Sequence, residues 1–193
     1  MSGNVSYSHN TIDQVRHNVG GVAGLNADAD FDADQYGLYV EAGHDIPLFS
    51  KTIFSPKALM NYQHLSIDDY SEKGAGGAGL DVESDDLDVF EIGLGAEVSW
   101  DFITDSGARL RPSLNTGYRY DLIGDSIDAT STFIAGGSAF STDGVDPAQG
   151  TFNVGAAISY AMDDNWELSA DYGVEVKDEY NSHTGHIRAD YKF

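Results

Sequence analysis

Apolar and polar residues alternate with a period of two along much of this chain. Between Phe90 and Phe102 the even-numbered positions are apolar, whereas the odd-numbered ones are glycine, serine or acidic residues. This is the period of a β-strand with two chemically different faces, and no segment shows a competing helical period. The pattern recurs at 109–122, 151–162 and 166–176, and more loosely at 2–10, 35–46 and 53–68. With the last segment of the chain, this predicts about eight strands.

The connections between these segments alternate in length. Short connections are expected near 47–52, 103–108 and 163–165. Long ones are expected near 11–34, 69–88 and 123–150, with 178–185 as a shorter member of the same set. Because successive antiparallel strands return to opposite ends of a sheet, all short turns lie at one end and all long loops at the other. Outer-membrane β-barrels have this asymmetry, with short periplasmic turns and long external loops.

Strand length and aromatic placement agree with a membrane crossing. About 13 residues at roughly 3.3 Å each, tilted by about 40°, rise roughly 33 Å, enough to cross an apolar band of about 25 Å. Aromatic residues lie at the ends of the apolar rows, where a bilayer places amphipathic rings at the headgroup boundary. The predicted aromatic girdle consists of Phe90, Trp100, Phe102, Tyr118, Tyr120, Tyr160 and Trp166.

The opposite face of the predicted strands carries charges of both signs. We expect these side chains to line a hydrated interior, in which they can compensate one another. The predicted lumen-facing residues are Glu91, Glu97, Asp101, Arg109, Arg111, Arg119, Asp171 and Arg188. Glycines such as Gly93, Gly95 and Gly117 fall on the same face, so that parts of the wall carry no side chain and a peptide could pass close to it.

A soluble barrel of the lipocalin type would show the same period with its apolar face turned inward. Periodicity alone does not decide which face is outside. The long strands, the rings at both ends of the apolar rows and the shortage of lysine on the polar face favour the membrane-spanning version. The predicted fold is therefore all-β, an antiparallel up-and-down transmembrane β-barrel.

Composition narrows the choice of partners. Lys and Arg total 10 against 32 Asp and Glu, a formal charge of −22, which repels nucleic acid. The chain has no cysteine and hence neither a disulfide nor a thiolate metal site. No apolar run has the length of a membrane helix, and the first ten residues lack a signal-peptide pattern. Spanning β-strands leave almost no hydropathy signal, which is consistent with a mean hydropathy of −0.31.

Two local motifs suggest ligands but depart from the required pattern. Gly74, Gly76 and Gly79 match G-x-G-x-x-G, yet no helix is expected after them to hold a pyrophosphate. The acidic run at 28–34 has the spacing of an EF-hand, but position six is Gln35 where the sharp turn needs glycine. Loose divalent-cation contact by these acidic loops stays an alternative to a solvated, repulsive fringe.

Histidine and nucleophile patterns give no further site. His183 and His186 are expected to straddle a loop and the start of a strand, without a third ligand nearby. Serine, aspartate and histidine all occur, but no nucleophile elbow marks a catalytic serine. We predict no catalytic residue, no enzyme activity, no cofactor and no metal site.

Three stretches resemble the C-terminal β-domain of the autotransporters, the translocator of type V secretion in Gram-negative bacteria. They are "YSEKGAGGAGLDVES" after the strand "IFSPKALMNYQHL", then "LRPSLNTGYRYDL", and the ending "EYNSHTGHIRADYKF". Their order and spacing are similar to the last eight strands of that domain and cover nearly the whole chain. One departure is Arg188, which stands where such endings often have glycine.

The resemblance implies a twelve-stranded barrel in the bacterial outer membrane, threaded by a linker, that anchors or exports an N-terminal passenger to the cell surface. It further implies contact with outer-membrane lipid, and recognition of the last strand by the barrel assembly machinery through Tyr191 and the terminal Phe193. On this basis residues 1–193 are expected to form one barrel domain that is truncated on its N-terminal side. A complete small eight-stranded outer-membrane barrel, adhesin or porin-like, and the soluble apolar-ligand binder are the alternatives.

Overall fold

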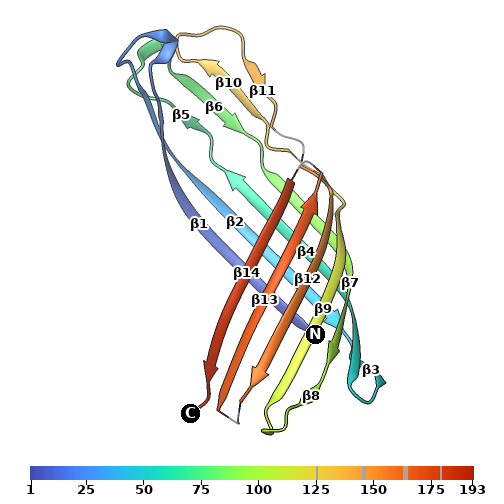
Figure 1. Ribbon diagram of the computed structural model, residues 1–193. Helices are drawn as coiled ribbons and strands as arrows, with labels where there is room; N and C mark the ends of the chain where they lie inside the picture. Colours follow the sequence, from blue (N-terminus) through green and yellow to red (C-terminus); the bar gives the residue numbers. More distant parts are fainter. Residues whose placement is uncertain (125, 145–146, 163–164, 179) are drawn as a thin grey trace.

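Eight long antiparallel strands dominate the computed structural model, which describes residues 1–124, 126–144, 147–162, 165–178 and 180–193 (Figure 1). They are β1 (Ser2–Arg16), β2 (Ala27–Gly43), β4 (Thr52–Ile67), β7 (Leu87–Trp100), β9 (Arg109–Asp121), β12 (Gly150–Ala161), β13 (Trp166–Lys177) and β14 (Tyr180–Tyr191). Each pairs with the next along the chain in the order β1-β2-β4-β7-β9-β12-β13-β14. The predicted all-β, up-and-down arrangement of about eight strands is confirmed.

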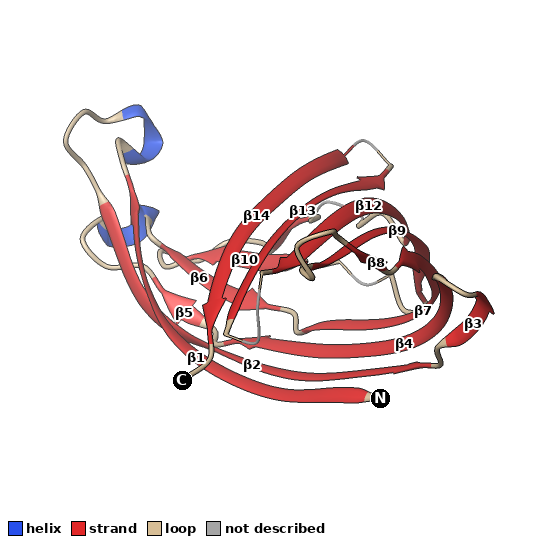
Figure 2. Cartoon of the chain, turned by 60° about the horizontal axis from the view of Figure 1, so that its bottom comes forward, coloured by secondary structure: helices blue, strands red, loops and turns tan. Residues whose placement is uncertain are grey.

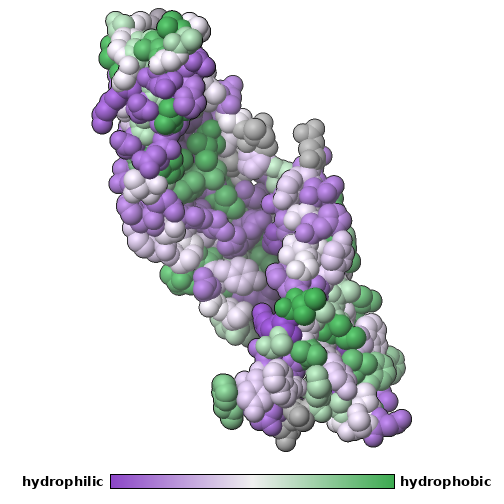
Figure 3. All heavy atoms as spheres, turned by 60° about the vertical axis from the view of Figure 1, so that its left-hand side comes forward, coloured by the Kyte–Doolittle hydropathy of each residue, from purple (hydrophilic) through white to green (hydrophobic). Residues whose placement is uncertain are grey.

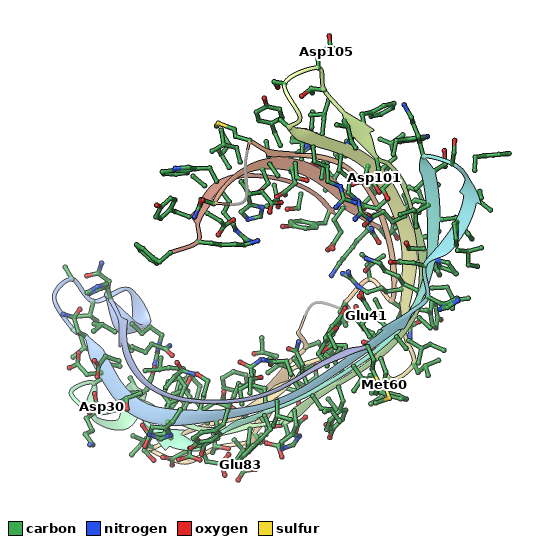
Figure 4. All side chains as sticks on the ribbon, turned by 90° about the horizontal axis from the view of Figure 1, so that it is seen from below. Asp30, Glu41, Met60, Glu83, Asp101 and Asp105 are labelled. Carbon is green, nitrogen blue, oxygen red and sulfur yellow. The ribbon has the colours of Figure 1, made fainter. Side chains whose placement is uncertain are left out.

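The sheet curls into a trough with a C-shaped cross-section (Figure 4). Its two edges are β1 and β14, and among the described residues no pairing joins them. The eight strands therefore form a half-barrel with two open edges. In a membrane an open edge leaves unpaired backbone groups, so both edges require a partner strand there.

Short hairpins lie at one end of the trough, toward which both termini also point (Figure 1). Strand β3 (Ile46–Phe49) folds back on β4, and β8 (Phe102–Ile103) folds back on β9. The connections predicted near 47–52 and 103–108 are thus short and share one end. The third predicted short turn includes residues 163 and 164, which lie outside the described residues.

The opposite end carries a second sheet, which we call the distal sheet, of order β11-β10-β6-β5. Its strands are β5 (Tyr70–Ser71), β6 (Leu80–Ser84), β10 (Ala129–Phe133) and β11 (Phe140–Thr142). Two short 3-10 helices, η1 (Val19–Gly21) and η2 (Gly76–Ala78), lie beyond the ends of the long strands (Figure 2). The GAGGAG motif thus forms a 3-10 turn, and no α-helix follows it.

The long connection expected at 11–34 is mostly strand, contrary to the prediction. Strands β1 and β2 stay paired out to Arg16 and Ala27, so only the residues between them form a loop. The acidic run at 28–34 therefore belongs to β2. Aspartate disfavours strands, which suggested a loop, but here it alternates with Ala27, Ala29 and Ala33, all of which are buried.

The connection expected at 178–185 is also corrected. Pairing between β13 and β14 starts at Lys177 and Tyr180 and continues without a break to Trp166 and Tyr191. The polar residues 180–185 suggested a turn, but they pair across a complete antiparallel ladder. The turn itself includes residue 179, which lies outside the described residues.

Buried apolar side chains are small, and most of them lie toward the distal sheet, whereas Ala108 directly precedes β9 at the short-turn end. Among the described residues the buried apolar set is Val19, Ala27, Ala29, Ala33, Ala75, Val82 and Ala108. The larger apolar residues of the long strands stay exposed, including Leu94 at 73% and Ile187 at 90%. The apolar rows therefore do not fill a closed core. In the part of the chain that the structure describes, no helix has the length and apolarity to cross a membrane.

Candidate functional site: the polar concave wall

The two faces of the curled sheet differ in chemistry. Figure 4 places Glu41 on the inner side of the curve and Met60 on the outer side. Glu41 pairs with Leu59 in the ladder between β2 and β4, and Met60 pairs with the preceding Val40. Because side chains alternate along each strand, the register extends these two faces across the sheet. In the space-filling view, hydrophilic side chains gather in the hollow of the trough (Figure 3).

Arg119 of β9 lies at the centre of an ion-pair network on the concave wall. Its Nη2 donates to Oε2 of Glu175 at 2.8 Å, and its Nε lies 3.4 Å from Oε1 of Glu91. Asn61 Nδ2 donates to the other oxygen of Glu91 at 2.9 Å, and Lys177 Nζ lies 3.7 Å from Glu175. One guanidinium thus links a carboxylate of β7 to a carboxylate of β13. These two strands flank β9 and β12 in the sheet.

A second group of charges lies nearer the short-turn end. Glu97 faces Lys57 Nζ at 3.6 Å, while Arg111 Nη2 donates to the buried hydroxyl of Ser99 at 3.0 Å. Arg109 is the first residue of β9, and its Nη2 lies 3.0 Å from Oδ1 of Asp101. Opposite charges compensate one another along the wall, an arrangement that a water-filled interior tolerates.

The last two strands bring together Asp171 and His186, with Nδ1 of the histidine 2.9 Å from the carboxylate. Arg188 lies two residues further along β14, opposite Ser169. His183 lies on the other face of the same strand, where its ring contacts the Tyr172 hydroxyl at 2.7 Å. Both histidines are thus inside a strand and on opposite faces, not at a loop boundary as predicted.

Glycines let polar side chains pack closely on the concave wall. A Cβ on Gly117 would lie 2.7 Å from Oδ1 of Asn153, and one on Gly93 would lie 2.9 Å from Cγ of Arg119. Two polar hollows of about 330 Å³ and 250 Å³ open onto this wall, and both are lined by Asn115, Asn153 and Arg119. An extended segment laid along the wall would meet amide and guanidinium donors and bare backbone.

Sequence reasoning missed the asparagines of this site. Asn61, Asn115 and Asn153 carry no charge, so the search for charged lumen residues passed over them. Their signal is positional, because each occupies a polar-face position of a strand with strict alternation.

The aromatic residues of the predicted girdle lie toward the strand ends. Trp166 packs on Tyr191 with ring centroids 4.9 Å apart, and Phe90 meets Tyr62 edge-on at 6.5 Å. Lys51 Nζ lies 5.5 Å above the Phe102 ring. The remaining members pair across the sheet, Trp100 with Thr52, Tyr118 with Leu94, Tyr120 with Ile92, and Tyr160 with Leu110 and Leu168.

The chain end places two aromatic rings together. Tyr191 stacks edge-on against Phe193 at 5.2 Å, and Phe193 itself is fully exposed. Tyr191 also contacts Trp166, so that the end of β14 presents a small aromatic cluster at the short-turn end of the sheet.

The half-barrel, its polar inner wall and its exposed apolar outer rows can now be compared with known proteins. A sequence profile described as the autotransporter beta-domain matches residues 1–173. The chain belongs to the autotransporter β-domain family. No curated protein matches it.

A solved autotransporter structure has the same fold. It is the translocator domain of the autotransporter NalP from Neisseria meningitidis, to which this autotransporter β-domain is similar with a TM-score of 0.60 at 18% sequence identity. The match covers 99% of this chain and 59% of that chain. This β-domain thus spans somewhat under two thirds of the length of the known translocator.

Metal chemistry finds no support on the described part of this β-domain. No group of three or more histidine, cysteine, aspartate or glutamate side chains within it is arranged to hold a metal ion. The aspartates with EF-hand spacing, Asp30, Asp32 and Asp34, lie in strand β2, and an EF-hand loop is not formed.

Proposed function

We propose that this chain is the translocator domain of an autotransporter in the bacterial outer membrane. In this proposal the convex apolar face contacts outer-membrane lipid, and the concave wall lines the passage for a passenger attached on the N-terminal side. Family membership supports a transport domain without catalysis. The alternatives, a soluble apolar-ligand binder and a complete small adhesin or porin-like barrel, are not favoured by the family match.

The observation that carries this proposal is the chemical difference between the two faces of one sheet. On the inner face, Arg119 forms ion pairs with two carboxylates, and neighbouring glycines leave the backbone uncovered by side chains. On the outer face, Leu94 and Ile187 are left exposed, at a free-energy cost in water that hydrocarbon removes. A soluble barrel would bury the second set and expose the first.

The open edges at β1 and β14 set a condition on this function. A translocator must close its sheet within the bilayer, because unpaired edge groups cost several kcal/mol each, by order of magnitude, in hydrocarbon. Further strands of the whole autotransporter are the partners of both edges in this proposal, and in the 193-residue chain alone the two edges pair with each other when it inserts into a bilayer. The passage for the passenger would then be bounded by those strands and by this concave wall.

The proposal also includes an assembly role for the end of β14. Tyr191 and Phe193 form an exposed aromatic pair at the chain end, which suits recognition by the barrel assembly machinery. Phe193 meets the Tyr191 ring on one side and is otherwise exposed, so most of its surface is free to enter a pocket on a partner.

The experiment is to express the chain in Gram-negative cells behind a secretion signal and an epitope tag placed ahead of residue 1. We expect the tag to become accessible to external protease and the domain to migrate as a compact band that is lost on boiling. Replacing Phe193→Ala should lower the amount of the compact band several-fold, whereas Lys192→Ala should not. A tag that stays periplasmic while the domain is folded in the membrane would contradict translocation, and equal behaviour of the two variants would contradict the assembly role.

A further inference from the structure

The convex face carries an apolar groove. It has a volume of about 510 Å³ and is lined by Ala58, Leu59, Ile92, Gly93, Leu94, Tyr118 and Tyr120. These residues come from the neighbouring strands β4, β7 and β9. None of them is charged, and polar atoms contribute almost nothing to the lining.

Small residues form the floor of this groove. Ala58 faces Leu94 in the ladder between β4 and β7, and it extends the side chain by only a methyl group. Gly93 has no side chain, and a Cβ at that position would point to the concave side, toward Cγ of Arg119. Position 93 therefore presents only backbone to the groove between the side chains of Ile92 and Leu94, as an inward-facing position of a strand does.

The two tyrosines form a wall of the groove, with their ring ends directed toward the residues at the start of β12. Tyr120 Oη donates to Oε1 of Gln149 at 3.0 Å. A Cβ on Gly150 would lie 2.6 Å from the Tyr118 hydroxyl, so glycine there makes room for that ring end. Both phenols thus reach toward β12, which leaves the space over Ile92 and Leu94 unfilled.

Polar groups lie on the convex face beyond one end of the groove, outside the residues that line it. In β4 the position after Met60 on the convex face is Tyr62, whose hydroxyl donates to Asp88 at 2.7 Å, and His64 Nδ1 lies 3.0 Å from the same carboxylate. With Gln149 and the Tyr120 hydroxyl, these groups lie toward the distal sheet. The apolar groove matches the acyl chain of a membrane lipid, and the hydrogen-bonding groups beyond its end match the headgroup.

We propose that this groove binds one acyl chain of a bilayer lipid. The inference rests on the proposed function, because it requires the convex face to lie in hydrocarbon. In a bilayer the molecules next to this groove are lipids. The groove has no charged residue in its lining, so it offers no ion pair to a charged ligand and few hydrogen bonds to a polar peptide. Within a bilayer the gain comes from dispersion contacts with Ile92, Leu94 and the two rings, since transfer from water contributes nothing there.

The test uses the full 193-residue chain folded into phosphatidylcholine vesicles that contain a phospholipid with a photoactivatable group in one acyl chain. After irradiation, cross-linked residues are mapped by mass spectrometry. We expect labelling at residues 58–60, 92–94 and 118–120 to exceed that at residues 154–158 on the same face by about fivefold, which corresponds to about 1 kcal/mol of preference. Uniform labelling of the convex face would overturn the proposal.

A filled groove provides the matched comparison. Ala58→Phe places a ring in the slot and should reduce the excess labelling to the level of the surrounding face. Ala156→Phe places the same ring on β12, at an exposed position of the same face outside the groove, and should leave the excess unchanged. Retention of the excess in Ala58→Phe would also overturn the proposal.

Folding is measured separately in the same vesicles by gel mobility with and without boiling. A chain that folds but labels uniformly contradicts the acyl-chain site alone. A chain that shows no boiling-sensitive compact band and no acyl-chain labelling contradicts the proposed membrane function as well.

Discussion

Two arginines in this β-domain pair with glutamate in opposite ways. On the concave wall, the Arg119 guanidinium is shared between Glu91 and Glu175, and all three side chains are partly exposed. Beneath the distal sheet, Arg16 makes a two-point contact with Glu72, through Nε at 2.9 Å and Nη2 at 2.5 Å. The carboxylate of Glu72 is only 3% exposed, whereas those of Glu91 and Glu175 are 14% and 30% exposed.

The difference separates a fixed structural contact from an adaptable one. Glu72 also accepts the Leu80 backbone N–H at 2.9 Å, so its carboxylate joins β1, the loop before η2 and β6. A bidentate, buried pair of this kind has one good geometry. The shared guanidinium of Arg119 sits beside two polar hollows, where water can replace either carboxylate. The Arg16–Glu72 pair thus fixes the distal sheet to the ends of the long strands, while the concave wall carries an arginine that is shared between two partly exposed carboxylates.

The largest effect is expected when the fixed pair is broken. Glu72→Gln keeps the volume but removes the charge, and it leaves Arg16 without its bidentate partner. Because Arg16 is itself about one third exposed, we expect a loss of about 2–3 kcal/mol, somewhat below that of a fully buried pair. Hydrogen exchange at the amides of Asp28 and Lys73, which bond β2 to this region, measures the loss.

The control for this variant is Glu83→Gln, which removes a carboxylate from an exposed position of β6. Exchange at Asp28 and Lys73 should not change there. If Glu72→Gln and Glu83→Gln behave alike, the buried pair does not fix the distal sheet.

Acid should weaken the same contact to a smaller extent. The hydrogen bond from Arg16 holds the pKa of Glu72 below its ordinary value of 4.5, and the Leu80 N–H contributes in the same direction. A carboxyl group with a lowered folded pKa contributes stability that is complete above about 4.5 and is lost as the pH falls through the folded pKa. The protection factors of the Asp28 and Lys73 amides, which correct for the intrinsic pH dependence of exchange, should therefore stay constant near neutral pH and fall once the pH drops below about 4.5. Glu72→Gln should abolish this acid-dependent step, and an unchanged step in the variant would assign it to another group.

A smaller effect is expected from a methyl group added beside Arg119. Gly93→Ala would place Cβ 2.9 Å from Arg119 Cγ and 3.1 Å from the Tyr118 carbonyl oxygen, whereas Gly173→Ala meets nothing within 4 Å. The first should cost about 1–2 kcal/mol, because backbone oxygen cannot move away cheaply. The second should be neutral. Urea titration of vesicle-folded protein compares them, and equal midpoints would show that the wall around Arg119 is not closely packed.

Periodicity in the sequence predicted the long strands well, because a two-sided sheet imposes a strict alternation. The row 109–122 predicted β9 to within one residue, and the row from Phe90 to Phe102 predicted β7 to within three residues at each end. The alternation also placed Glu91 and Arg119 on one face. The register then brings them to ion-pair distance, which no single strand could reveal.

The distal end could not be predicted in the same way. Aspartates between Ala27 and Ala33 suggested a loop, although in the folded chain Ala27 packs in a small core with Val19 and Ala75, and Ala29 and Ala33 are also buried. The pair of Arg16 with Glu72 joins residues 56 positions apart, with no local pattern to mark it. The open edges at β1 and β14 likewise depend on how far the sheet curls.

The orientation of the sheet can be tested directly by the position of single probes. The chain has no cysteine, so Leu94→Cys on the convex face and Asn115→Cys on the concave face can each be labelled with the same environment-sensitive fluorophore. In vesicles of brominated lipid we expect strong quenching at position 94, and at position 115 little quenching but ready access to a water-soluble collisional quencher. The reverse result, with position 115 quenched by lipid and position 94 reached from water, would contradict the account.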